Sequence, residues 1–64
     1  MKLLIVNMKC GGCARGVTAI IHDIDSNAKI DMDLAAKVVN IDTIASVDQM
    51  MAALARDDFP AQVQ

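Results

Sequence analysis

Met8-Lys9-Cys10-Gly11-Gly12-Cys13 joins an apolar stretch to an amphipathic one and contains both cysteines of the chain. The run before it, Leu3-Leu4-Ile5-Val6, is short, apolar and continuous, which predicts a buried strand. After it, apolar residues recur at intervals of three and four, as on one side of a helix: Val17, Ile20, Ile21 and Ile24. We therefore expect the cysteines on a strand-to-helix turn, with Cys13 at or near the first helical residue.

The expected position of the cysteines favours thiolates over thiols. The first turn of a helix has backbone N–H groups without intrahelical partners, together with the positive end of the helix dipole. Lys9 and Arg15 flank the pair, and their positive charge stabilises a thiolate further. Gly11 and Gly12 allow backbone conformations that are closed to other residues, so both sulfurs can converge on one point. The sequence thus predicts a mobile, electropositive site with two thiolates.

Two thiolates at this spacing suit a soft metal ion. Structural zinc normally takes four protein ligands, whereas the only histidine, His22, lies about 13 Å along the helix from Cys13. A pair of soft sulfurs suits near-linear coordination, which favours Cu(I) among physiological ions and Hg(II) among toxic ones. The ligand pair alone does not separate copper from mercury, zinc or cadmium. A thioredoxin-like dithiol is a further alternative, although such sites belong to longer α/β domains.

Met8-x-Cys10-x-x-Cys13 at the end of a first strand, in a chain of 64 residues, closely resembles the heavy-metal-associated domain family. This family includes copper chaperones, N-terminal modules of metal-transporting P-type ATPases and mercury-binding proteins. The resemblance extends to the closing Asp58-Phe59-Pro60-Ala61. It implies that Cys10 and Cys13 bind the ion and that Phe59 shields it. Lys9 and Phe59 depart from the family pattern, which often has a small or hydroxylated residue at the first position and tyrosine or lysine at the second.

Hydrophobic patterning predicts the remaining elements. If Met8 packs inward, as the resemblance implies, a first strand over residues 2–8 would place Leu4 and Val6 on the inner face with it, and Leu3 and Ile5 on the outer face. We interpret Met8 as a support beneath the cysteine loop. A helix over 13–25 should follow, and then a strand over 28–34 with Ile30, Met32 and Leu34 inward. A third strand should point Val39 and Ile41 inward. The last two elements are a helix from the N-cap Ser46 to near Asp57 and an edge strand over 59–63.

This order, βαββαβ, predicts an α+β fold of the ferredoxin-like type, with a four-stranded antiparallel sheet and two helices on one face. Residues 1–64 are expected to form a single heavy-metal-associated domain. Ala35-Ala36-Lys37 would form a hairpin connection without glycine. Met32, Met50 and Met51 fall on core periods, so we interpret them as packing residues and not as ligands.

Composition narrows the function. The formal charge is −2 and the only aromatic residue is Phe59, which argues against nucleic acid as a partner. The first apolar run is too short for a signal peptide or a membrane span, so we expect a cytoplasmic protein in a reducing compartment. His22 has no plausible nucleophile beside it, and Ser26 and Ser46 suit turn and cap roles. We therefore expect no enzymatic activity.

The hypothesis is a Cu(I) metallochaperone that passes its ion by thiolate exchange to the metal-binding domain of a P-type ATPase. Cys10 and Cys13 would bind the metal, and Met8, Lys9, Gly11, Gly12, Arg15 and Phe59 would support the site. The alternatives are a mercury, zinc or cadmium protein of the same fold and, less favoured, a thiol–disulfide oxidoreductase. We expect a monomer without metal, and a weak metal-bridged dimer at high protein concentration.

Overall fold

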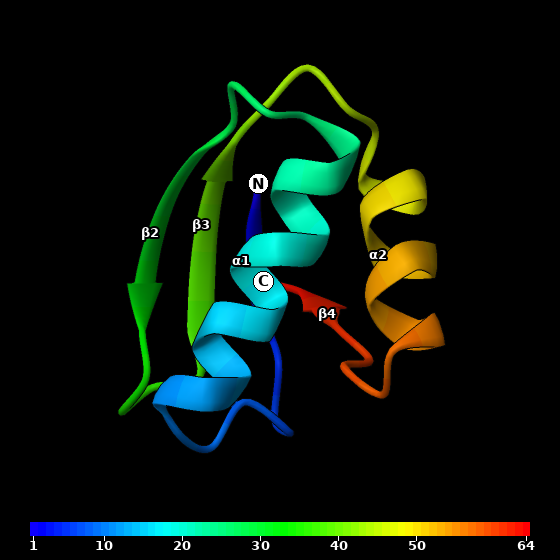
Figure 1. The fold of residues 1–64 in the computed structure, drawn as a ribbon. Coiled ribbons are helices and arrows are strands. Elements are labelled where there is room, and N and C mark those ends of the chain that lie inside the picture. The colour runs from blue at the N-terminus through cyan, green and yellow to red at the C-terminus, as the bar shows by residue number, and fades with distance from the viewer.

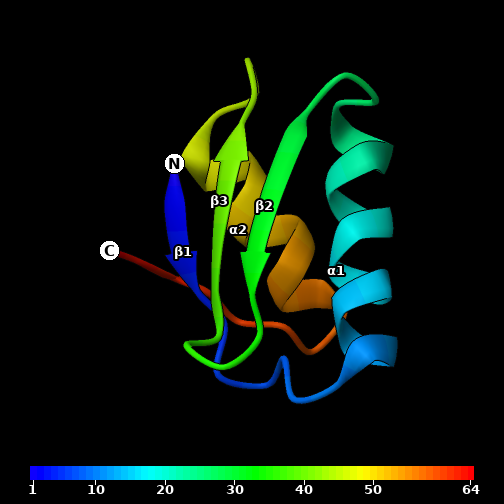
Figure 2. The ribbon, with the colours of Figure 1, turned by 90° about the vertical axis from the view of Figure 1, so that its left-hand side faces the viewer.

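The structure, a computed structural model, describes all residues from 1 to 64. Six elements follow in the order β1 (Lys2–Leu4), α1 (Gly11–Ile24), β2 (Lys29–Asp33), β3 (Val38–Asp42), α2 (Val47–Arg56) and β4 (Gln62–Val63). The strands form one antiparallel sheet in the order β2-β3-β1-β4. Both helices cover the same face of this sheet (Figure 1, Figure 2). The predicted ferredoxin-like α+β fold is confirmed.

The connections between elements gather at two opposite ends of the molecule (Figure 1, Figure 2). At one end lie the β1–α1 loop with both cysteines, the β2–β3 turn and the α2–β4 loop, and we call this the cysteine end. At the other lie the α1–β2 and β3–α2 loops, which we call the far end. The site is thus built where three separate connections meet.

The predicted faces of the first strand are wrong. Leu3 and Ile5 were expected on the outer face, but both are fully buried, whereas Val6 is 50% exposed. The reason is that β1 ends at Leu4, and a turn follows in which the Met8 N–H donates to the Ile5 carbonyl over 3.1 Å. The turn interrupts the two-residue period, so Met8 is buried as predicted although Val6 is not.

The β2–β3 connection is the predicted hairpin without glycine. Lys37 takes the left-handed conformation (φ 59°) that glycine usually supplies, and the Asp33 carboxylate accepts from the Ala36 N–H over 3.1 Å. Leu34 was expected inside, but it lies in this turn and is 40% exposed. Ile30 and Met32 do pack against the core.

The core lies between the sheet and the helices. As predicted, Val39 and Ile41 point inward from β3 and Met50 points inward from α2, where Leu54 is buried as well. The complete set of residues in the main cluster is Leu3, Ile5, Met8, Val17, Ile21, Ala28, Val39, Ile41, Met50, Leu54 and Ala61.

The helix ends differ in how well the sequence predicted them. The Ser46 hydroxyl accepts from the Gln49 N–H over 3.1 Å, which confirms Ser46 as the N-cap of α2. By contrast, α1 begins two residues before Cys13, at Gly11.

The last strand is an edge strand as predicted, but it covers only Gln62–Val63 because Pro60 has no N–H group to donate.

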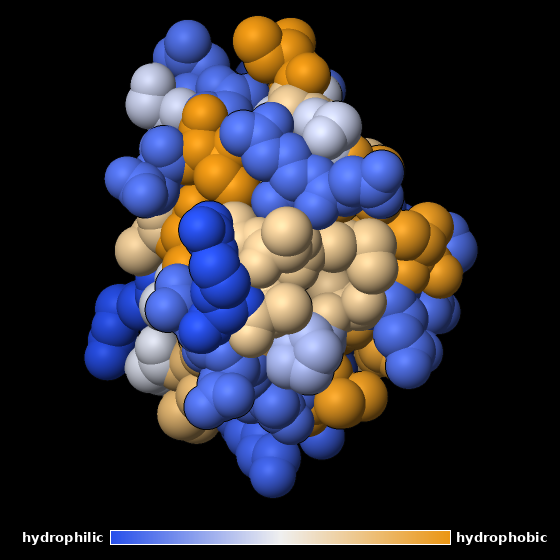
Figure 3. All heavy atoms as spheres, turned by 90° about the vertical axis from the view of Figure 1, so that its right-hand side faces the viewer, coloured by the Kyte–Doolittle hydropathy of each residue, from blue (hydrophilic) through white to orange (hydrophobic).

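The outer side of α2 carries small residues. Ala52 and Ala55 are exposed, and the space-filling view of this side shows a weakly apolar centre bordered by polar side chains and by some strongly hydrophobic ones (Figure 3). Neither α1 nor α2 has the length and apolar character needed to cross a membrane.

Candidate metal site

Both cysteines lie at the N-terminus of α1. Cys10 is the N-cap residue, with extended backbone (φ −152°, ψ 175°), and its carbonyl accepts the Ala14 N–H over 3.0 Å. Cys13 follows in the first helical turn. The amides of Gly11, Gly12 and Cys13 are among those that the helix leaves without an internal acceptor, so positive partial charge is directed toward the sulfurs. The prediction of a strand-to-helix turn is correct in kind, although the helix starts earlier.

The two thiols are free and close together. Their Sγ atoms lie 3.6 Å apart, well beyond a disulfide bond. Cys10 is exposed, whereas Cys13 is half-buried and packs against the core cluster. The pair therefore has an outer sulfur that is open to solvent and an inner sulfur that is anchored to the fold.

The surroundings of Cys10 favour its thiolate. The Cys13 backbone N–H lowers the pKa of Cys10 most, followed by the Cys13 thiol, the Gly12 N–H and the charge of Arg15. Desolvation opposes these contributions. Because a thiolate is the form that binds metal and attacks electrophiles, Cys10 is prepared for ligation at a lower pH than an ordinary cysteine.

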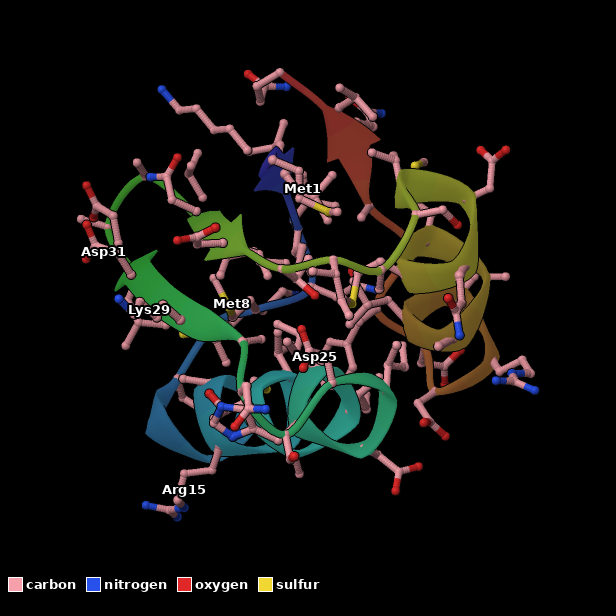
Figure 4. All side chains as sticks on the ribbon, turned by 90° about the horizontal axis from the view of Figure 1, so that it is seen from above. Met1, Met8, Arg15, Asp25, Lys29 and Asp31 are labelled. Carbon is pink, nitrogen blue, oxygen red and sulfur yellow. The ribbon has the colours of Figure 1, made fainter.

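Met8 lies directly below the cysteine loop. Its side chain is fully buried, and it points into the space between the sheet and the helices (Figure 4). A buried thioether without access to solvent supports packing and not ligation. The predicted burial of Met8 is thus confirmed, and its role as a support of the loop stays a prediction.

The glycine pair does not have the predicted conformational role. Both Gly11 and Gly12 are helical residues of α1, and no glycine of the chain has positive φ. A Cβ atom on Gly11 would meet nothing within 4 Å, and one on Gly12 would lie 3.8 Å from the Cys10 sulfur. Their backbone is therefore open to other residues, and what the glycines provide is a surface without side chains beside the sulfurs.

Exposed charged residues lie on the loops of the cysteine end and near the start of α1. Lys9 and Arg15 are exposed, and the Arg15 side chain points away from α1 into solvent (Figure 4). On the side of α2, Asp57 and Asp58 are exposed, and the Asp58 carbonyl accepts from the Asn7 side chain over 2.9 Å. Among these charged residues, Arg15 is the one whose charge lowers the pKa of Cys10.

Phe59 lies beside α1. A Cβ atom on Gly16 would be 3.6 Å from the Cε2 atom of the Phe59 ring, so the ring occupies the space that Gly16 leaves. Gly16 follows Cys13 by three residues and shares its side of the helix. Phe59 is half-buried and contacts the core cluster, as does Cys13. The ring thus lies about one helical turn from Cys13, and its shielding of an ion stays a prediction.

No third ligand is provided. The structure contains no group of three or more histidine, cysteine, aspartate or glutamate side chains that could hold an ion. His22 is exposed as predicted, and its Nε2 atom lies 3.2 Å from the Ala28 carbonyl oxygen, at the end of α1 away from the cysteines. Any ion held here by the protein alone would have the two sulfurs as its ligands.

The separation of the sulfurs is shorter than linear coordination of an ion between them requires. With metal–sulfur bonds of about 2.3 Å, sulfurs 3.6 Å apart subtend about 100° at an ion, and linear coordination needs a separation of about 4.6 Å. Cys10 is exposed at the helix terminus and is the sulfur free to move outward. An ion bound at this separation would have a bent S–ion–S arrangement, with one side open to a further ligand.

Sequence reasoning missed one residue of this region. The Asn7 side-chain amide joins the cysteine loop to the α2–β4 loop, across 51 residues of sequence. No local pattern signals such a contact, because its acceptor is a backbone carbonyl whose position depends on the whole fold.

The chain matches known metal-binding proteins along most of its length. Residues 2–56 match the heavy-metal-associated domain. The copper transport protein ATOX1 of Homo sapiens is 39% identical over 49 residues, which cover 77% of this chain and 71% of that protein. Among solved structures, a gold binding protein superposes with a TM-score of 0.96 at 38% identity, covering 100% of this chain and 98% of the other. The copper chaperone Atx1 from Synechocystis PCC6803 superposes with a TM-score of 0.92 at 26% identity, covering 97% and 98%. The chain therefore belongs to the heavy-metal-associated domain family.

Proposed function

We propose that this protein is a Cu(I) metallochaperone. Cys10 and Cys13 bind the ion and pass it, by exchange of thiolate ligands, to the metal-binding domain of a metal-transporting P-type ATPase. The observation that carries the proposal is the pair of free sulfurs, 3.6 Å apart at an exposed helix N-terminus. The role of the protein is delivery of the ion and not catalysis.

The choice of Cu(I) rests on the ligands. Thiolates are soft donors and select Cu(I), while the absence of a third or fourth protein donor disfavours the closed tetrahedral sites of structural zinc. The names of the human and cyanobacterial relatives, a copper transport protein and a copper chaperone, support this choice.

Transfer begins at Cys10. One thiolate of the receiving domain attacks the bound ion from its open side and forms a three-coordinate intermediate, from which Cys10 leaves. The second thiolate of that domain then attacks, and Cys13 leaves. Gly11 and Gly12 carry no side chains that would obstruct this approach. Val6 and Leu34, which are 50% and 40% exposed at the cysteine end, offer apolar contacts to the receiving protein.

A second candidate is a carrier of another soft ion. The superposition on a gold binding protein favours it, because two thiolates that hold Cu(I) also suit Au(I) and Hg(II). Zn(II) and Cd(II) are the borderline cases, since they favour more ligands than this site supplies. The two candidates share Cys10 and Cys13 and differ only in the ion.

The proposal includes a cytoplasmic location and a monomer in the absence of metal. Lys9 and Arg15 reduce the repulsion between two dithiolates, so the loaded protein forms a weak metal-bridged dimer at high concentration. Sedimentation of the apo and loaded forms measures this, and a tight apo dimer would contradict a role in delivery, because it would hide the cysteines.

The experiment that tests the function is a competition between ions, followed by transfer. Under anaerobic conditions the protein is loaded with Cu(I), Au(I), Hg(II), Zn(II) or Cd(II) and challenged with a chelator of known affinity. The Cu(I) form is then mixed with a CxxC domain of a copper-transporting ATPase. We expect Cu(I) to be held against the chelator and to equilibrate rapidly with that domain. The matched control is His22→Ala, which removes the one imidazole and leaves both thiols in place.

Retention of Zn(II) or Cd(II) in preference to Cu(I), or Cu(I) transfer no faster than its release to buffer, would refute the chaperone proposal. Catalysed turnover of a small disulfide, well above that of a simple dithiol, would instead favour the oxidoreductase.

A further inference from the structure

Two backbone carbonyls hold the segment that leads from β1 to the cysteines. The Ile5 N–H donates to the Lys37 carbonyl over 2.8 Å, and the Asn7 side-chain amide donates to the Asp58 carbonyl over 2.9 Å. Lys37 and Asp58 are also the two non-glycine residues of the chain with positive φ, at 59° and 67°. The left-handed residues of this fold thus both serve the entry to the cysteine loop.

The conformation of Asp58 belongs to the end of α2. The Phe59 N–H donates to the Leu54 carbonyl over 2.9 Å and the Asp58 N–H to the Ala55 carbonyl over 3.2 Å, which is the hydrogen-bond pattern of a Schellman motif. Glycine usually occupies the left-handed position of this motif, because other residues adopt that conformation at a cost. The motif orients the Asp58 carbonyl, and Asn7 is the side chain that binds it.

The same motif places Phe59. Asp58 immediately precedes Phe59, whose ring fills the space beside Gly16 on α1. Asn7 immediately precedes the buried Met8, and Met8 in turn lies two residues before Cys10. A single amide–carbonyl hydrogen bond therefore joins the backbone that enters the thiol site to the backbone that carries its aromatic neighbour.

We propose that Asn7 is a positioning residue of the cysteine site. Its amide holds the α2–β4 loop against the cysteine loop and keeps the Phe59 ring over the start of α1. The ring then limits the approach of small competing ligands to Cys13 and its ion. The part of this proposal that concerns release of the ion rests on the proposed Cu(I) function, whereas the part that concerns the ring holds for the metal-free protein.

The chain contains no tryptophan or tyrosine, so a Phe59→Trp variant provides a single fluorescent reporter at the ring position. In this background we compare Asn7→Ala, which removes the amide, with Asn7→Asp, which keeps the shape but offers no N–H donor at neutral pH. Asn40→Asp is the matched control, because Asn40 is exposed on β3 and its substitution changes the charge in the same way as Asn7→Asp.

We expect both Asn7 variants to shift the metal-free emission to longer wavelength, because the indole becomes more exposed to water. We expect release of Cu(I) to a small chelator to be faster by about 2- to 10-fold, the factor that corresponds to the loss of one hydrogen bond. The measurements are made well below the unfolding temperature of every variant. Asn40→Asp should leave emission and release unchanged.

Emission that stays unchanged in both Asn7 variants would overturn the proposal, and so would a shift in emission with release at the parental rate. If the parent protein fails to hold Cu(I), the proposed function falls, while the emission still tests the link between Asn7 and Phe59. If Phe59→Trp does not fold, amide hydrogen exchange at Asp58 and Phe59 in the native background replaces it. Faster exchange in Asn7→Ala supports the link, and unchanged exchange refutes it.

Discussion

The far end and the cysteine end are both formed by loops between helices and strands, but their polar side chains have different partners. At the far end, the Asp25 carboxylate accepts the Thr43 hydroxyl over 2.6 Å and the Asn27 N–H over 3.0 Å. The Thr43 hydroxyl in turn accepts the Ala45 N–H over 3.1 Å. These groups satisfy one another, so they need nothing from outside the chain.

At the cysteine end, the two thiols contact each other and backbone N–H groups, and no other side chain forms a hydrogen bond with them. The Cys10 thiol makes its side-chain contact with Cys13, and the amides of the first helical turn add partial positive charge without capping side chains. The comparison teaches that the fold completes one helix–strand junction internally and leaves the other available for a ligand. An ion held by Cys10 and Cys13 would be the partner of the thiolates at the cysteine end, as Thr43 and Asn27 are the partners of the Asp25 carboxylate at the far end.

The largest expected effect follows from removing one sulfur. Cys10→Ser or Cys13→Ser should lower the affinity for Cu(I) by orders of magnitude, because a hydroxyl is a poor ligand for a soft ion. Competition with a chelator measures this affinity, and thermal unfolding of the apo protein should show the fold intact. A single variant that retains copper as well as the parent would place the metal elsewhere.

Next in size is the loss of the packing below the cysteine loop. Met8→Ala should lower the free energy of unfolding by about 2–5 kcal/mol, as large-to-small changes in a core do. Met8→Leu keeps the volume and should cost less than about 1.5 kcal/mol. Urea denaturation compares both with Met51→Ala at a half-buried site of α2, for which a smaller loss is expected. An equal loss for Met8→Ala and Met51→Ala would show that Met8 is not a special anchor.

The far end predicts a pH-dependent effect. The Thr43 hydroxyl, and after it the Asn27 N–H, hold the pKa of Asp25 below its ordinary value of 3.8. A lowered folded-state pKa means that the stabilisation is fully present above the unfolded pKa and is lost as the pH falls through the folded one. Thr43→Val should therefore destabilise the protein more at pH 7 than at pH 2.

Thermal unfolding of the parent and of Thr43→Val gives the destabilisation that the substitution causes at each of the two pH values. Part of the loss persists in acid, since the Ala45 N–H also loses its acceptor. A loss that is the same at pH 7 and pH 2 would contradict the assigned role of Asp25.

The smallest expected effect is a gain. Gly16→Ala places a methyl group in ordinary contact with the Phe59 ring, 3.6 Å from Cε2, in the interior of α1. Because glycine is a poor helix residue, the substitution should stabilise the protein by about 0.5–1 kcal/mol. Urea denaturation provides the measurement, with Ala19→Gly at an exposed α1 position as the reverse control. Destabilisation by Gly16→Ala would show that the ring packs more tightly against α1 than described.

Local signals in the sequence predicted much of the fold and the position of the cysteines. The Ser46 cap, the alternation around Val39 and Ile41, and the helical spacing after Cys13 each depend on a few neighbouring residues. The faces of β1 were mispredicted because Leu3-Leu4-Ile5-Val6 is apolar throughout and shows no alternation from which to take a phase. No glycine or proline marks the turn that follows it.

The remaining features depend on long-range contacts. The link between Asn7 and Asp58 and the left-handed conformations of Lys37 and Asp58 arise where separate segments meet. For the glycine pair, a local pattern was present but its interpretation was wrong. Its sequence suggested special backbone conformations, but Gly11 and Gly12 lie in an ordinary helix. Their effect concerns space beside the sulfurs, which a pattern of residue types does not reveal.

The most direct test of the central claim is X-ray absorption at the copper edge, on Cu(I)-loaded protein shown by sedimentation to be monomeric. The account predicts two sulfur neighbours at one distance from the ion, supplied by Cys10 and Cys13, and no nitrogen or oxygen neighbour. A nitrogen ligand or a third sulfur in the monomer would contradict it, because no histidine or acidic side chain groups with the two cysteines and the Met8 thioether is fully buried.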